Sequence, residues 1–405
     1  MDVCHPRCCG IDVHKDSLMV CLLIEDQAPI IERFGATTRE LLRLGDWLAG
    51  QQIPILAMES TGVYWKPVWN LLEDRFDLLL VNAQHIKQVP GRKTDVKDCQ
   101  WIAQLLRHGL LKRSFVPDRN QRELRDLTRM RTTLVNERAT VANRIQKLLE
   151  DANIKLGSVV ADILGVSSRQ MLMALIEDRQ TPEQMAQMAR SAMRPKIPQL
   201  IVALEGKLRD HHRFMLRQHL DQARHLEKQI DAFDARIEEQ MGPFGDALRR
   251  LDAIPGINAR AAQCMIAEIG LDMSRFPTPH HLASWAGLCP GNNESAGKRR
   301  TARTNFGNRN LKSMLVQVAW AAARTKKSYF QAQYHRIKSR RGHKKAIVAI
   351  AHSMLITAWH LLSRKTEYVD LGPLHFDKVR KTQVTGRLVR RLQQLGYQVA
   401  LTPAA

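Results

Sequence analysis

Four acidic residues in the first hundred positions are the side chains best suited to bind a metal ion: Asp12, Glu59, Asp95 and Asp98. Asp12 is a charge inside the apolar stretch 10–13, and such a charge is costly unless it binds a cation or another partner. Carboxylates that gather in one place bind hard divalent cations, and paired cations drive phosphodiester chemistry. The four residues therefore predict a site for Mg²⁺ or Mn²⁺ that acts on nucleic acid.

The elements around these residues predict a mixed α/β sheet with helices on both faces. Glu59 follows an apolar strand at its carboxyl end, where ligands bind in α/β folds. Asp95 and Asp98 lie three residues apart at the start of a helix, so their side chains share one face. Any one of the four could instead be a surface acid or a helix cap, since the helix dipole alone favours Asp95. Strands are expected at residues 9–13, 17–24, 29–34, 53–58 and 76–81, and helices at 38–48, 62–72 and 95–106.

Two long helical segments, at about residues 118–153 and 214–241, follow this first domain of residues 1–117. The first segment has apolar residues every seven positions, at Leu127, Leu134, Val141 and Leu148. Arg131 and Arg138 interrupt the adjoining seam position, so the stripe is imperfect. The pattern predicts an antiparallel coiled-coil arm over residues 118–241 with a helical insert, although an ordinary helical bundle fits it nearly as well.

Residues 242–405 are predicted to form a mainly helical C-terminal domain. It contains the turn Ile254-Pro255-Gly256-Ile257-Asn258, followed by a helical run over residues 261–269. This resembles a helix-hairpin-helix, whose turn directs backbone N–H groups at a phosphate. Asn258 stands where a second glycine is more usual, and asparagine tolerates a positive φ better than most residues. A simple corner between two helices accounts for the turn about as well.

The charge of the chain indicates a polyanionic partner, because the net charge is +22 and the share of aromatic residues is only 5%. Between Ser295 and Thr366 there are seventeen Lys and Arg residues and not one Asp or Glu. Although a charge run is usually a solvated face, a stretch this long without an acid predicts a phosphate-contacting surface. Trp320, Tyr329, Phe330 and Tyr334 are interleaved with these cations. The candidate nucleic-acid-binding residues are Arg92, Lys93, Lys298, Arg299, Arg300, Arg303, Arg309, Lys312, Arg340, Arg341, Lys344 and Lys345.

The remaining composition indicates a cytoplasmic protein without a membrane segment. The longest apolar run near the N-terminus, at residues 18–24, is too short to span a bilayer. The seven cysteines are scattered without a disulfide framework. Cys4, His5, Cys8 and Cys9 crowd together, but no second Cys/His pair follows at the spacing of a zinc site.

Several of these segments together resemble the signature blocks of a known family, the DEDD transposases of bacterial insertion sequences. The likeness is to the insertion-sequence-110 family and, through the long middle region, to its 1111 subgroup. The blocks are Gly10-Ile11-Asp12-Val13-His14-Lys15, Glu59-Ser60-Thr61-Gly62-Val63-Tyr64-Trp65, Lys93-Thr94-Asp95-Val96-Lys97-Asp98, Ile254-Pro255-Gly256-Ile257, Trp285-Ala286-Gly287-Leu288-Cys289-Pro290, Asn293-Glu294-Ser295-Ala296-Gly297-Lys298 and Phe306-Gly307-Asn308. Cys99 departs from the pattern, since the family often has alanine there.

The resemblance implies an RNase H-like N-terminal domain, similar to Holliday-junction resolvases, and a serine nucleophile in the C-terminal domain. The matching serine is Ser295, which on sequence grounds alone would most often be a loop residue. Ala296 and Gly297 leave room for a phosphate, and the cations at 298–300 could stabilise a phosphorane. The resemblance also implies donor and target DNA as partners, a guide (bridge) RNA, and a homo-oligomer between dimer and tetramer.

Together these features indicate a DNA recombinase that cuts and rejoins strands and is associated with the nucleoid in the bacterial cytoplasm. Two rival interpretations remain open. In the first, the protein is a metal-dependent, junction-resolving nuclease in which water attacks and Ser295 is structural. In the second, it is a non-catalytic RNA- or DNA-binding scaffold.

Overall fold

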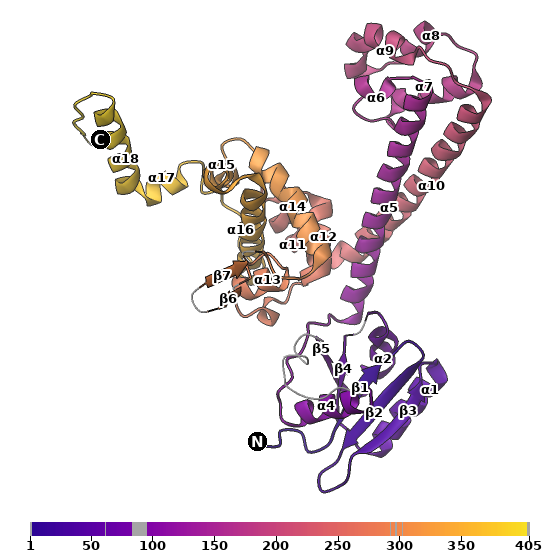
Figure 1. Cartoon of the computed structure of the whole chain (residues 1–405), viewed down its shortest axis with the longest axis vertical. Helices are drawn as coiled ribbons and strands as arrows, with labels where there is room; N and C mark the ends of the chain where they lie inside the picture. The colour runs from indigo at the N-terminus through magenta and orange to yellow at the C-terminus, as the bar shows by residue number, and fades with distance from the viewer. Residues whose placement is uncertain are drawn as a thin grey trace. The chain divides into compact units, whose positions relative to one another are not determined.

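The computed structural model describes residues 2–60, 62–82, 95–291, 293–295, 298–301 and 303–402. For residues 95–97, 293–295 and 298–301 the description covers the backbone only. Contacts divide the chain into two units, Met1–Pro117 and Asp118–Ala405. Figure 1 draws both units. The predicted limits of the three domains stay predictions.

The first unit is built on a five-stranded sheet with the order β3-β2-β1-β4-β5. Its strands are β1 (Cys8–Val13), β2 (Ser17–Leu23), β3 (Ile30–Gly35), β4 (Ile55–Glu59) and β5 (Asp77–Val81). β1, β2 and β3 pair antiparallel, whereas β1, β4 and β5 pair parallel. The prediction of a mixed α/β sheet is therefore confirmed.

Helices cover both faces of this sheet. Alternate residues of each strand point to opposite faces, so one strand can contribute to an apolar cluster on each side. Cys9, Ile11 and Val13 of β1 pack in one cluster with apolar residues of α1 (Thr38–Gly50) and α2 (Trp65–Leu72). Cys8 packs in the other cluster, with apolar residues of α4 (Asp95–Arg107). β1 is thus a central strand that is buried on both faces.

Two predicted boundaries in this unit are wrong by a few residues. The helix expected from residue 62 begins at Trp65, because Gly62 has a φ of +53°, outside the helical region. The strand expected at 53–58 covers Ile55–Glu59 instead, so that Glu59 is the last strand residue.

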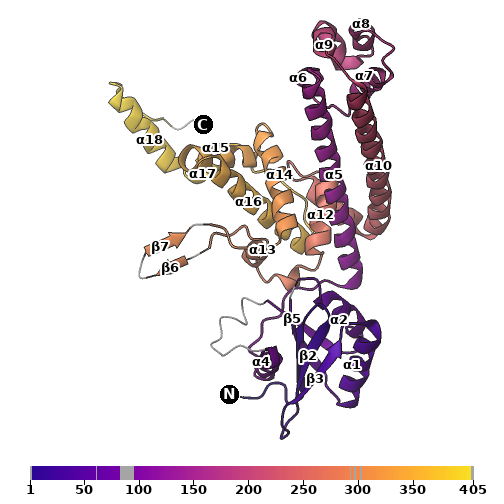
Figure 2. The same cartoon turned by 45° about the vertical axis from the view of Figure 1, so that its right-hand side comes forward.

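The second unit begins with two long helices, α5 (Arg119–Asp151) and α10 (Asp210–Met241), which lie side by side in Figures 1 and 2. Leu134 and Val141 are buried between them, as predicted, whereas Leu127 and Leu148 are only partly buried. Arg131 pairs with Asp234 and Arg138 pairs with Glu227, so α5 and α10 run antiparallel. The two seam arginines are therefore ion-paired to the opposite helix.

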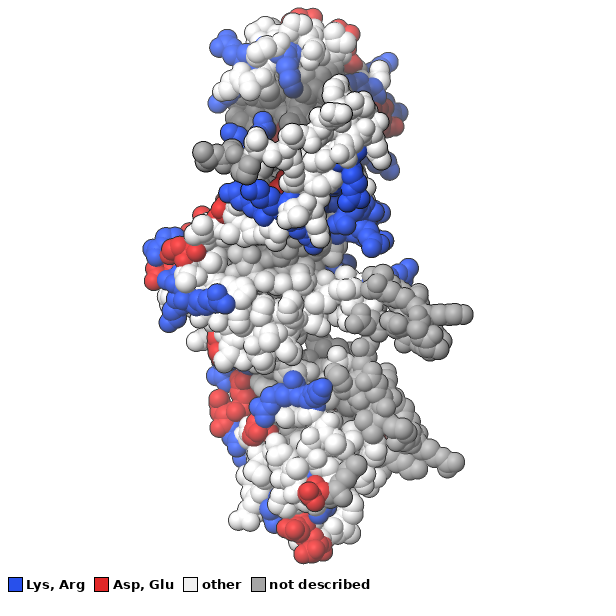
Figure 3. Space-filling model, turned by 90° about the vertical axis from the view of Figure 1, so that its left-hand side faces the viewer, with Lys and Arg blue, Asp and Glu red and all other residues white. Residues whose placement is uncertain are grey.

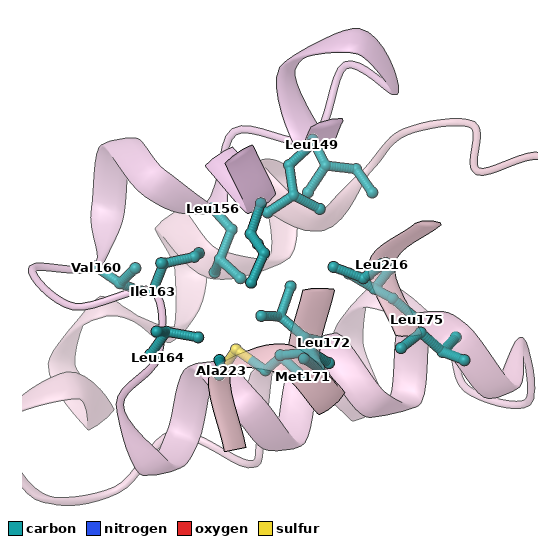
Figure 4. Packing of buried hydrophobic residues seen from close by; sticks show 14 of the residues in the cluster. Leu149, Leu156, Val160, Ile163, Leu164, Met171, Leu172, Leu175, Leu216 and Ala223 are labelled. Atoms are coloured by element: carbon teal, nitrogen blue, oxygen red, sulfur yellow. The ribbon is translucent and has the colours of Figure 1, made fainter. Parts of the chain in front are cut away.

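The helical insert closes the end of this arm. It consists of α6 (Leu156–Val159), α7 (Val166–Glu177), α8 (Pro182–Ala186), η1 (Ser191–Lys196) and α9 (Ile197–Leu204). Leu156 and Leu172 of the insert belong to the same hydrophobic cluster as Leu149 of α5 and Leu216 of α10, so the insert and both long helices share one core (Figure 4).

The rest of the second unit is a helical bundle with one hairpin. Its elements are η2 (Gly242–Phe244), α11 (Gly245–Asp252), α12 (Ala259–Ile269), η3 (Met273–Arg275), α13 (Pro279–Trp285), β6 (Asn293–Ser295), β7 (Lys298–Thr301), α14 (Arg309–Arg324), α15 (Tyr329–Arg341), α16 (His343–Arg364), α17 (His375–Val379) and α18 (Lys381–Gln394). α16 packs against α11, α13, α14 and α15. Among the described residues α16 is the one helix long and apolar enough to cross a membrane, and half of that apolar stretch is buried inside the bundle.

Two expectations for this bundle are corrected by the structure. Asn258 has a φ of −112° and caps α12 by accepting a hydrogen bond from the Ala261 N–H, so it needs no positive φ. Gly256 does have a positive φ, and a Cβ there would lie 2.5 Å from the Ala322 nitrogen of α14. The turn is therefore packed against a helix. Phe330 and Tyr334 are buried core residues rather than part of an exposed surface.

Candidate active site

Asp12 lies on β1 and faces the side of the sheet that α4 covers. Only 8% of the residue is exposed, which is unusual for an acid. His14 Nε2 lies 3.1 Å from Asp12 Oδ2, and this contact is an ion pair when the imidazole is protonated. Asp12 is therefore a buried carboxylate at the end of a central strand.

Glu59 ends the strand beside Asp12. Ile11 of β1 is in register with Met58 of β4, so Asp12 and Glu59 are the next residues on two parallel strands. Residues in register on parallel strands point to the same face of a sheet. Both predicted carboxylates therefore lie at one edge and on one face of the sheet.

Helix α4 brings Asp98 to the same face. A Cβ on Gly10 would lie 2.9 Å from Ala103 Cα and closer still to the Cys99 carbonyl oxygen, so only glycine lets α4 lie directly on β1. Burial raises the pKa of the Cys99 thiol, and the charges of Asp12 and Asp98 raise it further. Both carboxylates therefore act on one buried thiol at the contact between strand and helix.

Asp95 is the first residue of α4, one turn before Asp98, and the description of it covers the backbone only. Arg92 and Lys93 lie outside the described residues. Within the part of the chain whose side chains are described, no three Asp, Glu, His or Cys side chains are arranged to hold a metal ion.

The N-terminal cysteines belong mostly to the core of this unit. Cys8 and Cys9 are buried residues of β1, and Cys21 is buried on β2. Burial raises the pKa of Cys8 to about 11 and that of Cys21 to about 12. These thiols are therefore protonated at neutral pH, and their side chains serve packing.

Ser295 lies in the second unit, at the end of β6 in a two-stranded hairpin. Its backbone partner on β7 is Lys298, and residues 296 and 297 between them lie outside the described residues. The base of the hairpin is closed by the bridge between Pro290 and Thr304 and by the Gly291 N–H, which donates to the Arg303 carbonyl at 2.8 Å.

A buried acid anchors the loop that follows this hairpin. Glu268 of α12 is 2% exposed and accepts hydrogen bonds from Arg129 Nε at 2.7 Å and from Asn308 Nδ2 at 2.6 Å. Arg129 belongs to α5, and its hydrogen bond to Glu268 raises the pKa of the guanidinium. Asn308 also caps α14 by accepting a hydrogen bond from the Leu311 N–H. The N-terminal part of α5, which forms the foot of the arm, therefore meets α12 and the end of the hairpin loop at one carboxylate.

Glu268 was not predicted from the sequence, although it carries the same signal as Asp12, an acid within a largely apolar element. Glu268 is the one acid in the helix Ala259–Ile269, which is otherwise largely apolar. A buried acid in such a helix is costly unless it is paired.

Most of the predicted nucleic-acid surface is exposed where the structure describes its side chains. Arg303, Arg309, Arg340, Arg341, Lys344 and Lys345 are exposed. Lys312 is partly buried and donates to the Thr304 hydroxyl at 2.6 Å. Lys298, Arg299 and Arg300 belong to β7, where the description covers the backbone only. Figure 3 shows Lys and Arg side chains gathered in patches on one face of the molecule.

Comparison with known proteins finds two matches to transposase families. Residues 9–154 match the IS110 DEDD family, which is described as "Transposase", and residues 248–335 match "Transposase IS116/IS110/IS902 family". A probable family 20 transposase of Pseudomonas aeruginosa is 27% identical over 330 residues, which cover 78% of this chain and 87% of that protein. The transposase for insertion sequence element IS1111A of Coxiella burnetii is 22% identical over 370 residues, which cover 89% of this chain and 90% of that protein.

Proposed function

The chain belongs to the IS110 family of transposases, and we therefore propose that it cuts and rejoins the DNA of an insertion sequence with a metal-binding carboxylate site and a serine nucleophile. The observation that carries the proposal is the placement of Asp12 and Glu59 side by side on parallel strands, beneath the helix that begins with Asp95 and Asp98. The mixed sheet with helices on both faces also supports an RNase H-like fold, similar to that of Holliday-junction resolvases.

The proposed metal ligands are Asp12, Glu59, Asp95 and Asp98, and the ion is Mg²⁺ or Mn²⁺. The donor chemistry fits, because all four offer carboxylate oxygens, the ligands that hard divalent cations prefer. The burial of Asp12 supports the assignment, since a buried carboxylate gains most from a nearby cation. When bound, the ion would neutralise charge on the scissile phosphate and on the leaving oxygen.

Ser295 is the proposed nucleophile. Its hydroxyl oxygen attacks the phosphorus, the bond from phosphorus to one sugar oxygen breaks, and that oxygen takes up a proton as the serine hydroxyl loses one. The phosphoserine ester preserves the energy of the broken bond. A sugar hydroxyl of a second strand then attacks this ester, forms a new phosphodiester and releases the serine.

The proposed partners are donor DNA, target DNA and a bridge RNA encoded by the same element. The exposed cations on the acid-free stretch between Ser295 and Thr366 support binding to phosphates, which is insensitive to sequence. Base pairing by a guide RNA would then supply the sequence specificity. Sequencing of RNA that copurifies with the protein tests this part directly, and the absence of one defined RNA species would contradict it.

We also propose that the active protein is a homo-oligomer, from dimer to tetramer, in the bacterial cytoplasm at the nucleoid. Leu134 and Val141 are buried between α5 and α10 of one chain, so a contact between copies would use other surfaces of the arm. Light scattering at the concentrations that support recombination measures the mass, and an active monomer would exclude this proposal.

The serine mechanism predicts that Ser295→Ala loses both cleavage and a covalent protein–DNA adduct while keeping DNA binding. The rate should fall by several orders of magnitude, because no other group replaces the nucleophile. End-labelled DNA is incubated with the protein and separated by denaturing electrophoresis, which reveals label linked to protein.

A matched control is Ser274→Ala, an exposed serine in the short helix η3 of the same unit. This protein should cut and form adduct like the wild type. If the wild type cleaves without linked label and Ser295→Ala cuts equally well, water is the nucleophile and the nuclease interpretation replaces the serine mechanism.

A further inference from the structure

Phe306 is the most exposed residue among the large hydrophobic side chains that the structure describes, at 96%. Its ring therefore has almost no partner within the described parts of the chain. Single exposed apolar residues are common on protein surfaces, so exposure alone decides little. The backbone on either side of Phe306 and the charges around it are more informative.

The loop holds Phe306 between two anchored neighbours. On one side, the Asn305 N–H donates to the Cys289 carbonyl at 3.3 Å. On the other side, a Cβ on Gly307 would lie 2.6 Å from Gly287 Cα, so these two backbone segments are in direct contact. The phenylalanine is therefore held in solvent by a loop whose backbone is anchored on both sides of it.

The next residue adds a deeper anchor. The Asn308 N–H donates to the Trp285 carbonyl at 3.2 Å, and the Asn308 side chain donates to the buried carboxylate of Glu268. Glu268 is in turn paired with Arg129. Because this backbone is already fixed, less conformational entropy is lost when the exposed side chain binds a partner.

The surroundings of Phe306 are cationic. Arg303 and Arg309 lie three residues before and after it, and both are exposed. The whole stretch from Ser295 to Thr366 lacks an acid. An aromatic ring flanked by cations suits a single-stranded or unstacked nucleic acid, because the ring stacks on a base while the cations contact phosphates. The same charges disfavour a second copy of this basic surface as the partner.

We propose that Phe306 stacks on a base of the DNA strand that binds at the Ser295 hairpin, and so keeps that base out of its normal stack. Both residues belong to the segment between α13 and α14, with Ser295 next to the tip of the hairpin and Phe306 just beyond its base, so the stacked base lies several nucleotides along the strand from the phosphate bound at Ser295. This inference rests on the proposed function, because it requires DNA at the hairpin.

The test compares Phe306→Ala and Phe306→Trp with Phe214→Ala, which removes another exposed phenylalanine, 62% exposed on α10. The purified protein, with any RNA it carries, is titrated with DNA in which 2-aminopurine replaces successive bases of the target strand. Phe306→Ala should bind roughly five- to a hundredfold more weakly, the range expected for one stacked base. It should also lose the change in 2-aminopurine fluorescence at one position. Phe306→Trp should retain both properties, and Phe214→Ala should behave like the wild type.

A second substitution separates this inference from the function on which it rests. Arg340→Ala combined with Arg341→Ala should weaken DNA binding and flatten its salt dependence, with a slope lower by about 0.7 to 0.9 for each lost phosphate contact. If this protein is affected while Phe306→Ala keeps its affinity and fluorescence change, the stacking role is wrong and the basic surface stands. If neither protein is affected, both are wrong. If Phe306→Ala alters only the mass in solution, the ring contacts protein and the stacking role is also wrong.

Discussion

An Asp12→Asn protein is expected to bind DNA nearly as well as the wild type and to cleave it slower by on the order of a thousandfold. The substitution keeps the size of a side chain that is 8% exposed, so packing against α4 is preserved. What changes is the charge that would hold a cation, and a metal ligand acts mainly on the transition state. Single-turnover cleavage of labelled DNA in Mg²⁺, measured beside equilibrium binding, separates the two effects.

Asp16→Asn is the matched control, because Asp16 is an exposed acid four residues further along the same β-hairpin. Its cleavage rate should be unchanged. Normal cleavage by the Asp12→Asn protein in Mg²⁺ would remove this edge of the sheet from consideration as the active site.

A Glu268→Ala protein is expected to lose about 3–5 kcal/mol of the free energy of unfolding of the second unit. The Glu268 side chain is 3% exposed and that of Arg125 beside it is 11% exposed, so the substitution removes the carboxylate that neutralises a buried guanidinium. Arg125 keeps its hydrogen bonds to the backbone carbonyls of Ala267 and residue 268. Arg129 is 37% exposed and can be hydrated, which favours the lower end of that range. Urea unfolding followed by circular dichroism gives the free energy.

The comparison for this effect is Asp221→Ala, which breaks an exposed pair with Arg224 on the arm. Both side chains of that pair are more than half exposed, and the expected change is within about 1 kcal/mol. Equal unfolding free energies for the Glu268→Ala and wild-type proteins would mean that the contacts of Glu268 with Arg125, Arg129 and Asn308 do not stabilise the second unit.

The sheet of the first unit follows from local patterns that the sequence contains. Strand β1 is a short apolar run that is buried on both faces. In the two antiparallel strands after it, apolar residues either alternate with polar residues or follow one another, and turn residues bound each strand. The start of α2 was misjudged because Gly62 adopts a positive φ before a helix that begins three residues later. The conformation of Gly62 depends on the geometry of the turn, and the spacing of the apolar residues does not reveal it.

Long-range contacts account for most of what the sequence did not predict. Arg129 and Glu268 are 139 residues apart in the chain, and Gly256 meets α14 more than sixty residues later. Neither contact has a local spacing that would reveal it. The candidate carboxylates were easier to find, because Asp12 is a charge inside an apolar strand and Glu59 ends another apolar strand.

The length of the arm can be compared with the dimensions of a DNA duplex. Helix α5 has 33 residues, which at 1.5 Å per residue gives a rod of about 50 Å. Measured along B-DNA at 3.4 Å per base pair, that rod equals about fifteen base pairs, or roughly one and a half turns of duplex. Contacts made by the insert and contacts made at the foot of the arm, if both fell on one straight duplex parallel to the rod, would therefore meet opposite sides of the double helix.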